Sequence, residues 1–345
     1  MDQLADIFNG RLFETTSLTA AINNVPYVPQ VIGAMGLFEE EGVSDITVYV
    51  ERKGSSISLI PAKERGAPGT VITGEKRDGI PFKIPHLPTE AFILPDEVQG
   101  VRMFGTADQM ATVESVRDDK LTKMSLSLDQ TLEYHRLGAL QGKVYDADGK
   151  TVLVDLYNQF GLKELDAVSF NFAATYDPND PVKSGAIRKQ LTGVRRTMTD
   201  ELQMGPVAVP RMGALCGDEF WDALTNCPET RQTYLNQQEA SDLRNNDTLE
   251  VFTYGSCDFV NYRGSGAVKV ADNDVRFFPV GIPGLFITRF APAPYMETVN
   301  TKGLPKYTKA GLDPSGMNKF IQLEAQSNPL NICTRPRTLR RGTIK

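Results

Sequence analysis

The hydrophobic positions of this chain change their spacing several times. Residues 1–44 carry apolar side chains without a regular period, interrupted by prolines and glycines, so we expect an extended arm that lies on some other surface. Residues 45–95 contain short runs that are typical of β-strands, bounded by glycines, prolines and charged residues. These runs are Ile46–Glu51 and Ser56–Ile60 on the outward path, and Thr70–Thr73 and Ile80–Pro85 on the return.

The return half of this excursion is rich in proline. Proline has no backbone N–H to donate to a neighbouring strand, so the return path belongs at a sheet edge or in an extended ribbon. A two-stranded ribbon is only marginally stable in water by itself. We therefore expect residues 45–95, with a charged tip at Lys63–Gly69, to lie on a neighbouring copy of the chain and to become ordered on assembly. The prolines are Pro81, Pro85, Pro88 and Pro95.

A long helix is predicted next, from about Thr106 to Gln141. Thr106 suits the N-cap position, and Gly138 and Gly142 mark the end. At 1.5 Å per residue the helix would extend about 50 Å. One face is largely apolar and charged residues cover the rest, so we predict a spine helix that crosses the subunit. The apolar positions are Met110, Val113, Leu121, Met124, Leu128 and Leu132.

The second half of the chain alternates helices with β-rich runs. This order favours one α/β lobe from about residue 184 to 300. A hairpin with an Asp-Gly turn, Gly142–Asp155, precedes the lobe, and an extended run over residues 317–335 follows it. Within the lobe we predict helices at Ser184–Leu202 and Asp218–Leu224, and strands at Leu249–Tyr254, Phe259–Tyr262 and Val275–Val280.

Composition narrows the class of protein. Hydrophobic and charged contents of 41% and 23% over 345 residues are ordinary for a soluble globular protein. The chain has no run of eighteen apolar residues, so we expect no membrane span. Residues 1–6 lack the basic and apolar regions of a signal peptide, so we expect none. The four cysteines are far apart in sequence and the two histidines lie far from all of them, which argues against a zinc site and a disulfide framework. We expect buried or partly buried free thiols.

Charge is unevenly distributed along the chain. Residues 1–45 hold seven acids and one base, whereas residues 51–83 hold seven bases and four acids. Each segment by itself fits a solvated face. Opposite charges on two extended segments fit better as complementary strips on neighbouring subunits, which would set register and partner choice. The inter-subunit candidates are Glu39, Glu40 and Glu41 in the arm, and Arg52, Lys53, Lys63, Arg65, Lys76 and Arg77 in the excursion.

The search for catalytic chemistry is negative. The phosphate loop, the dinucleotide fingerprint, the nucleophile elbow and the zinc-protease signature are all absent from the sequence. A calcium loop at Asp146–Gly149 is disfavoured because Lys150 and Val152 occupy later ligand positions. We interpret His86 as a packed or solvated residue and His135 as a solvated residue of the long helix. The sequence predicts no enzyme, and no catalytic, cofactor-binding or metal-binding residue.

Two stretches resemble a known family. The hairpin and loop at Gly142–Pro181 and the extended run at Asn318–Leu330, with its Pro-Leu step, resemble the lambda-type major capsid protein family of tailed phages, the major capsid protein E family. The resemblance implies an α+β, HK97-like capsid fold. The implied parts are an N-terminal arm (1–44), a long β extension or E-loop (45–95), a peripheral domain with the spine helix (96–183), an axial domain (184–310) and a C-terminal segment returning to the peripheral domain (311–345).

The resemblance also implies a function and partners. The chain would be the major capsid protein of a tailed phage or prophage and form hexamers and pentamers of an icosahedral shell around double-stranded DNA. It would assemble in the host cytoplasm, reside in the virion, and require a separate scaffolding protein, a portal at one vertex and, in some particles, a decoration protein. A phage tail or baseplate protein and an unrecognised hydrolase are the alternatives. The first would more often show repeats without a long helix, and the second needs a clustered acid and base.

The C-terminal end is basic. It is either a flexible solvated tail or a clamp on a neighbour's acidic surface, and we favour the clamp. The net charge of −6 fits a weakly repulsive inner wall. We therefore expect duplex DNA to bind the subunit no better than non-specifically, at about 10⁻⁴ M or weaker. The bases are Arg335, Arg337, Arg340, Arg341 and Lys345.

Overall fold

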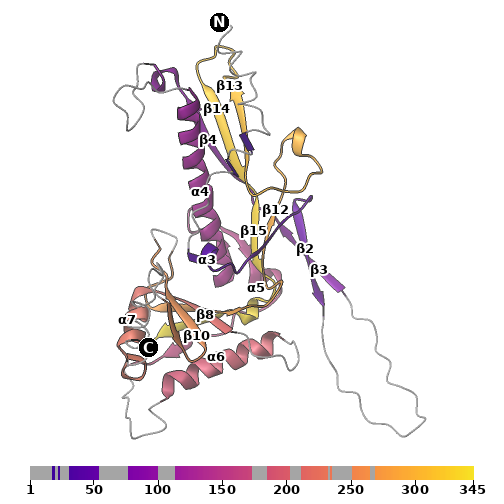
Figure 1. Ribbon diagram of the computed structural model, residues 1–345. Helices are drawn as coiled ribbons and strands as arrows, with labels where there is room; N and C mark the ends of the chain where they lie inside the picture. The colour runs from indigo at the N-terminus through magenta and orange to yellow at the C-terminus, as the bar shows by residue number, and fades with distance from the viewer. Residues whose placement is uncertain are drawn as a thin grey trace, which may run out of the picture. The chain divides into compact units, whose positions relative to one another are not determined.

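The computed structural model describes residues 18–19, 22–23, 31–53, 77–99, 113–172, 185–202, 211–231, 234, 251–264 and 269–345 (Figure 1). They combine helices and sheets, so the predicted α+β class is confirmed. By proximity of their Cα atoms, the residues fall into two compact units. Unit 1 consists of Met1–Val48, Lys83–Arg136 and Ile287–Asn331, and unit 2 of Tyr49–Phe82, Leu137–Phe286 and Ile332–Lys345.

The core of unit 1 lies between a three-stranded sheet and the long helix α4 (Val113–Gln141). The sheet is antiparallel with the order β13-β14-β4, in which β13 is Tyr307–Leu312, β14 is Ile321–Ser327 and β4 is Leu87–Ile93. Because side chains alternate along a strand, one face of β14 presents Ile321, Leu323 and Ala325 to Met124 and Leu128 of α4. Pro88 lies in β4 at the sheet edge, as its missing N–H predicts.

Helix α4 has 29 residues and a length of about 44 Å. Its predicted end is confirmed, because the chain turns at Gly142 with a φ of +86°, a region that favours glycine. The division between the two units falls within this helix, after Arg136, so the predicted spine contributes to both. The predicted start at Thr106 and the apolar Met110 lie outside the described residues. Of the remaining predicted apolar face, Leu121, Met124 and Leu128 are buried, and Val113 and Leu132 are half-buried.

The arm contributes two short elements. Helix α3 (Val31–Ala34) is followed by strand β1 (Glu39–Gly42), which pairs in parallel with β12 (Phe286–Phe290) in a sheet of order β1-β12-β15, where β15 is Pro329–Cys333. The close approach at the end of β1 requires glycine, because a Cβ on Gly42 would lie 2.0 Å from the carbonyl oxygen of Gly303. The arm therefore has a surface to lie on within its own subunit.

The β excursion begins and ends as a two-stranded ribbon. Strands β2 (Thr47–Lys53) and β3 (Arg77–Lys83) confirm the first outward strand and the last return strand, and Pro81 lies in a strand with a single neighbour, as predicted. The predicted strands Ser56–Ile60 and Thr70–Thr73 and the tip Lys63–Gly69 lie outside the described residues. At its base the ribbon is anchored in unit 2, where the Phe82 ring lies 5.5 Å from that of Phe160.

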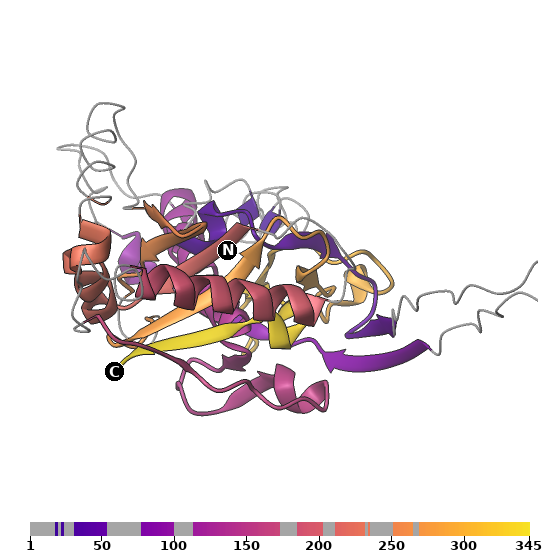
Figure 2. The ribbon, with the colours of Figure 1, turned by 90° about the horizontal axis from the view of Figure 1, so that it is seen from below.

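Unit 2 is built on a six-stranded mixed sheet of order β7-β16-β11-β8-β10-β9. Helices α6 (Ala186–Leu202) and α7 (Asp218–Asn226) pack on it, and α6 lies across the sheet in the view of Figure 2. The predicted repeat of α6 is confirmed, because Ile187, Leu191, Val194, Met198 and Leu202 are all buried. The strands are β7 (Val168–Phe170), β8 (Arg211–Cys216), β9 (Val251–Tyr254), β10 (Cys257–Asn261), β11 (Asp274–Val280) and β16 (Arg340–Ile344).

The predicted hairpin after α4 is confirmed as β5 (Lys143–Tyr145) and β6 (Val152–Asp155), which leads into α5 (Leu156–Gln159). Gly138, inside the last turns of α4, allows the hairpin to fold back closely. A Cβ there would lie 2.8 Å from the carbonyl oxygen of Lys143. The predicted cap of α6 at Ser184 lies outside the described residues.

The two compact units do not coincide with the domain bounds predicted from sequence. The predicted peripheral segment, 96–183, divides after Arg136, and its second part belongs to unit 2. The predicted axial segment, 184–310, divides after Phe286, and residues 287–310 belong to unit 1. The five predicted segments remain a prediction about roles in an assembled particle.

The basic C-terminal end is part of a sheet, so the flexible tail considered from the sequence is wrong. Residues 340–344 form β16, which lies between β7 and β11 inside the six-stranded sheet. The Arg341 guanidinium binds the buried carboxylate of Asp274 through contacts of 2.8 and 3.1 Å, and Arg337 pairs with Glu201 at 3.0 Å. The segment is therefore not a flexible tail, and two of its five bases have acid partners within their own subunit. The clamp on a neighbour's acidic surface stays a prediction.

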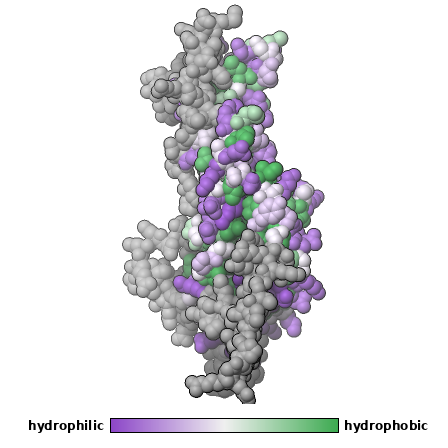
Figure 3. Space-filling model, turned by 90° about the vertical axis from the view of Figure 1, so that its right-hand side faces the viewer, coloured by the Kyte–Doolittle hydropathy of each residue, from purple (hydrophilic) through white to green (hydrophobic). Residues whose placement is uncertain are grey.

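The described surface and core agree with an ordinary globular chain. No helix among the described residues is long and apolar enough to cross a membrane. All four cysteines are free and buried, as predicted. On the face shown in Figure 3, hydrophobic residues are dispersed among hydrophilic ones.

Removing residues 340–345 should unfold unit 2. The truncation would open the sheet between β7 and β11 and expose Val275, Phe277 and Phe170, whose burial contributes about 1.5–3 kcal/mol each. Circular dichroism should show loss of cooperative melting, whereas a control lacking Lys345 alone should melt like the full chain. A folded truncated subunit would contradict the interior position of β16.

Candidate functional site

A second stripe of α4, beside the apolar one, consists of buried polar residues. Positions 125, 129, 133 and 136 recur at spacings of four, four and three, so they share one face of the helix. All are at most 5% exposed. Buried charges require partners, so the position of this stripe dictates what must pack against it. Its members are Ser125, Asp129, Glu133 and Arg136.

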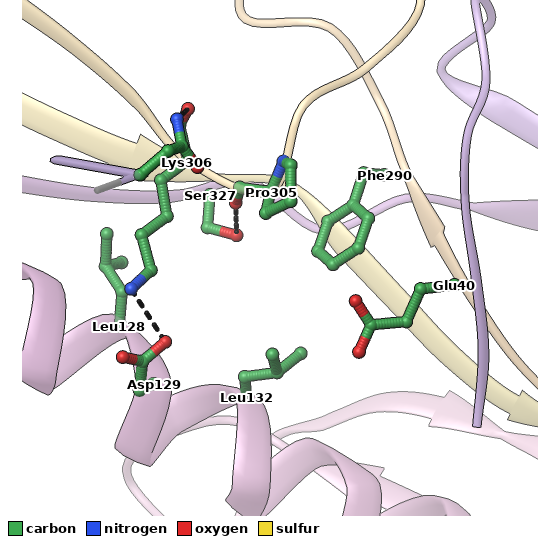
Figure 4. Close-up of a pocket in the computed structure, with 9 residues that line it drawn as sticks. Glu40, Leu128, Asp129, Leu132, Phe290, Pro305, Lys306 and Ser327 are labelled. Carbon is green, nitrogen blue, oxygen red and sulfur yellow. Dashed lines mark hydrogen bonds and ion pairs between the residues drawn. The ribbon is translucent and has the colours of Figure 1, made fainter. Parts of the chain in front are cut away.

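The first partner comes from the segment that leads into β13. The Lys306 ammonium lies 2.8 Å from the Asp129 carboxylate and 2.6 Å from the Ser125 hydroxyl, and Lys306 is 8% exposed. Figure 4 shows the Lys306 side chain extending to Asp129 of α4 from the segment that precedes β13. A buried, hydrogen-bonded ion pair of this kind fixes the register of two elements, because neither charge can be left alone.

The second partner is the arm helix α3. Both carboxylate oxygens of Glu133 accept hydrogen bonds from the arm backbone, one from the Ile32 N–H at 2.7 Å and the other from the Gly33 N–H at 3.1 Å. The first N–H groups of a helix have no acceptor within the helix, and a negative charge near them is favourable. Glu133 thus supplies the missing acceptors and attaches the arm to α4.

The third partner is strand β1. Glu40 forms an ion pair with Arg136, whose guanidinium also lies 5.5 Å from the centre of the Phe38 ring. Because side chains alternate along a strand, Glu39 and Glu41 point to the other face. There they flank Arg289 of β12, at 4.0 and 3.4 Å. Glu39, Glu40 and Glu41 thus all have an arginine partner within the subunit.

A cavity of about 300 Å³ lies between α4 and these partners. Leu128, Leu132 and Phe290 line it with apolar surface, and Asp129 and Glu40 contribute carboxylates (Figure 4). One Asp129 oxygen is buried without a hydrogen-bond partner among the described residues. The arrangement positions segments against one another, because the Lys306 ammonium holds both the Ser125 hydroxyl and the Asp129 carboxylate.

The sequence-predicted site residues are only partly brought together. Glu39, Glu40 and Glu41 lie in β1 and remain 48–60% exposed at the side chain despite their arginine partners. Among the bases, Arg52 and Lys53 belong to β2 and Arg77 to β3. Their pairing with a neighbour's acids stays a prediction. Lys63, Arg65 and Lys76 lie outside the described residues.

Sequence reasoning misses the polar stripe and misplaces one histidine. The sequence predicts a solvated His135, but this residue is 1% exposed, as is Glu133. Charged residues on a helix normally indicate its solvent face, and that rule fails here because the arm covers the helix. The signal in the sequence is the spacing of positions 125, 129, 133 and 136. His86, by contrast, is an exposed residue that shares a 2.8 Å hydrogen bond with Asn328.

Two further candidates for chemistry from the sequence are the Asp-Gly turn and the cysteines. In the predicted hairpin turn, the Thr151 hydroxyl donates to one Asp148 oxygen, and the N–H groups of Lys150 and Thr151 donate to the other. The hydroxyl bond first, and then the two backbone bonds, lower the Asp148 pKa. No group of three or more metal-binding side chains occurs in the part of the chain that the structure describes. Burial raises the pKa of Cys333 to about 12, so its thiol stays protonated at neutral pH and is not a nucleophile.

The fold is that of phage capsid proteins. The chain shares it with the crystal structure of the putative capsid protein of a prophage from E. coli CFT073, with a TM-score of 0.59, 13% identity, and coverage of 96% of this chain and 99% of that one. This agrees with the HK97-like fold expected from the sequence.

The sequence comparisons narrow the class to one family. The model of phage major capsid protein E matches residues 14–344, so the chain belongs to that family. It is 28% identical to the major capsid protein of Pseudomonas phage KPP10, covering 96% of each chain, and 28% identical to that of Salmonella phage Felix O1, covering 95% of each. The function is that of a phage major capsid protein, and the tail or baseplate alternative receives no support.

Replacing Lys306 with methionine should destabilise unit 1 by about 3–5 kcal/mol, because the Asp129 carboxylate would stay buried without its counter-charge. The double variant Lys306→Met/Asp129→Leu should recover most of that loss, because no buried charge remains. Chemical denaturation of the free subunit measures both. Equal losses in the single and double variants would show that the lysine acts through packing alone.

Proposed function

We propose that this protein is the subunit of a closed icosahedral shell, in which hexamers and pentamers enclose double-stranded DNA. Membership of the capsid protein E family supports the proposal. The observation that carries it is the two-stranded ribbon β2–β3, which has no further strand beside it among the described residues. Ile46 and Tyr49, at its start, are 68% and 67% exposed. Such a ribbon gains stability by lying on a neighbouring copy.

The partners follow from the same role. A separate scaffolding protein would direct assembly in the host cytoplasm, a portal would occupy one vertex, and a decoration protein would bind outside on particles that carry one. The mature subunit would reside in the virion and catalyse no reaction. DNA would be enclosed without tight binding, which a chain of net charge −6 favours because phosphates are repelled by it.

Negative-stain microscopy tests the proposal directly. The chain expressed with the neighbouring scaffold gene should form closed shells. Tubes or sheets would indicate a different assembly. A product that stays monomeric under all salt conditions would contradict the proposal.

The β extension should be protected only in the assembled state. Limited proteolysis should cut free subunits at Lys63–Gly69 and spare shells, because the charged, glycine-containing tip has little apolar surface to bury by itself. Cleavage at a site within unit 2 gives an internal reference. Equal protection at the tip in both states would contradict docking on a neighbour.

Reversing the charge of the extension should block assembly without unfolding the subunit. Exposed ion pairs contribute at most about 1 kcal/mol each, so several must be changed together. The variant combines Arg52→Glu, Lys53→Glu, Arg65→Glu, Lys76→Glu and Arg77→Glu. Shell yield at two salt concentrations and circular dichroism of the subunit are measured.

The control carries the same number of reversals at exposed lysines elsewhere: Lys123, Lys150, Lys163, Lys302 and Lys319. It should assemble at the wild-type yield. Normal shells from the extension variant would refute pairing between the extension and acidic surfaces. The acidic side is unsuitable for this test, because Glu40 and Glu41 also pair with Arg136 and Arg289 within the subunit.

A further inference from the structure

Helix α6 has a basic face that is turned away from the core of unit 2. Arg188, Lys189 and Arg196 are exposed and Arg195 is half-buried, whereas the opposite side of the helix is buried against the sheet. Positions 188 and 189 are separated from 195 and 196 by two turns, or about 10.5 Å along the axis. The four bases therefore form two pairs along one side of the helix.

These bases lack acidic partners. None of the four forms an ion pair with a residue that the structure describes. The Arg188 guanidinium lies 5.5 Å from the centre of the Tyr254 ring, but no comparable contact with a described residue exists for Lys189 or Arg196. The acid of α6 that does pair, Glu201, binds Arg337. Among the described residues, nothing offsets the charge of Lys189 and Arg196.

A glycine lies between the two basic pairs. Gly193 is exposed in the middle of α6, and a Cβ added there would meet nothing within 4 Å. Glycine destabilises a helix interior relative to alanine, and packing against the described residues gives no reason for it here. A glycine in such a position allows another element to approach the helix backbone closely. The approach would occur beside Lys189 and Arg196, one turn away on either side.

Helix α7 carries the complementary charge within the same unit. Asp218, Glu219 and Asp222 are exposed on its first two turns, while Phe220, Trp221 and Leu224 face the core. Asp218 pairs with Arg263 at 3.0 Å. Glu219 and Asp222 form no ion pair with the residues that the structure describes. Figures 1 and 2 both place α7 at one side of unit 2, beyond an end of α6.

We propose that the basic face of α6 in one copy docks on the acidic first turns of α7 in the next copy. A ring of identical subunits requires two different, complementary surfaces on each subunit, and these two helices supply them within one unit. Lys189 and Arg196 would face Glu219 and Asp222, with the neighbouring helix passing over Gly193. The contact rests on the proposed shell function, because it closes the rings from which a shell is built.

Charge reversal on each side tests the contact. The α6 variant is Lys189→Glu/Arg196→Glu, and the α7 variant is Glu219→Lys/Asp222→Lys. Each alone should lower the yield of shells by about tenfold or more at low salt, because two attractions become repulsions in every interface. The combined variant should assemble again, because each interface then carries the reversed charges on both sides. Circular dichroism of each free subunit shows that it is folded.

An equal mixture of the α6 variant and the α7 variant gives the sharper test. A subunit with two acidic faces can alternate in a six-membered ring with a subunit that has two basic faces, so the mixture should form mixed hexamers where neither variant does alone. Mass spectrometry of the hexamers measures the ratio, which should be three to three. Assembly of the α6 variant at the wild-type yield, or failure of both the combined variant and the mixture while the subunits are folded, would overturn the contact.

Two further outcomes distinguish the contact from nucleic-acid binding by α6 and from failure of the shell itself. If α6-variant shells form normally but retain less duplex DNA, the basic face binds nucleic acid and the docking is wrong. If the wild-type chain forms no shells, the proposed function fails and the contact fails with it. Gly193→Ala should raise the Tm of the free subunit by about 2–4 °C, while Gly193→Gln should reduce assembly. Normal assembly of Gly193→Gln would also count against the contact.

Discussion

The burial of three charges on one helix constrains the whole of unit 1. Asp129, Glu133 and Arg136 lie on the same side of α4, and a charge inside a protein is tolerated only when it is paired and hydrogen-bonded. The partners come from residues 306, 32–33 and 40, which are all far from α4 in the sequence. Unit 1 can satisfy α4 only when the arm and the segment before β13 are both in place. Hydrophobic packing of the neighbouring stripe supplies attraction, and the charges determine which segment goes where.

Unit 2 uses charge differently. Its core is apolar and aromatic, and its buried acid, Asp274, is held by Arg341 from the last strand of the chain. That bond, together with the position of β16 between β7 and β11, makes the C-terminus part of the sheet. Burial lowers the pKa of the nearby Arg276 guanidinium, while Asp274 opposes that shift. The outer faces of α6 and α7 also carry charge, and part of it, at Lys189, Arg196, Glu219 and Asp222, forms no ion pair with the residues that the structure describes.

The sequence predicts best where one physical signal dominates. The repeat of α6, the end of α4 at Gly142 and the hairpin at Asp148-Gly149 are local, and all three are confirmed. Pairing between segments that are far apart in the sequence cannot be predicted from such local signals. Arg340 and Arg341 look like a solvated tail because nothing local identifies β7 and β11 as their neighbours. Ser125, Asp129 and Glu133 have the sequence pattern of a solvent-exposed helix face, because their partners are distant in the sequence. The arm residue that binds Glu133 is 101 positions away, and Lys306 is 181 positions from Ser125.

The positions of the intramolecular arginines change what the acidic arm can contribute to assembly. Glu39, Glu40 and Glu41 offer three negative charges, but Arg136 and Arg289 offset two of them within the subunit. One net charge remains for a neighbour, and an exposed pair contributes little at physiological salt. Glu219 and Asp222, by contrast, have no such offset among the described residues. If electrostatics selects the partner surface in a ring, the faces of α6 and α7 are therefore better suited to it than the arm, whose acids anchor it to its own subunit.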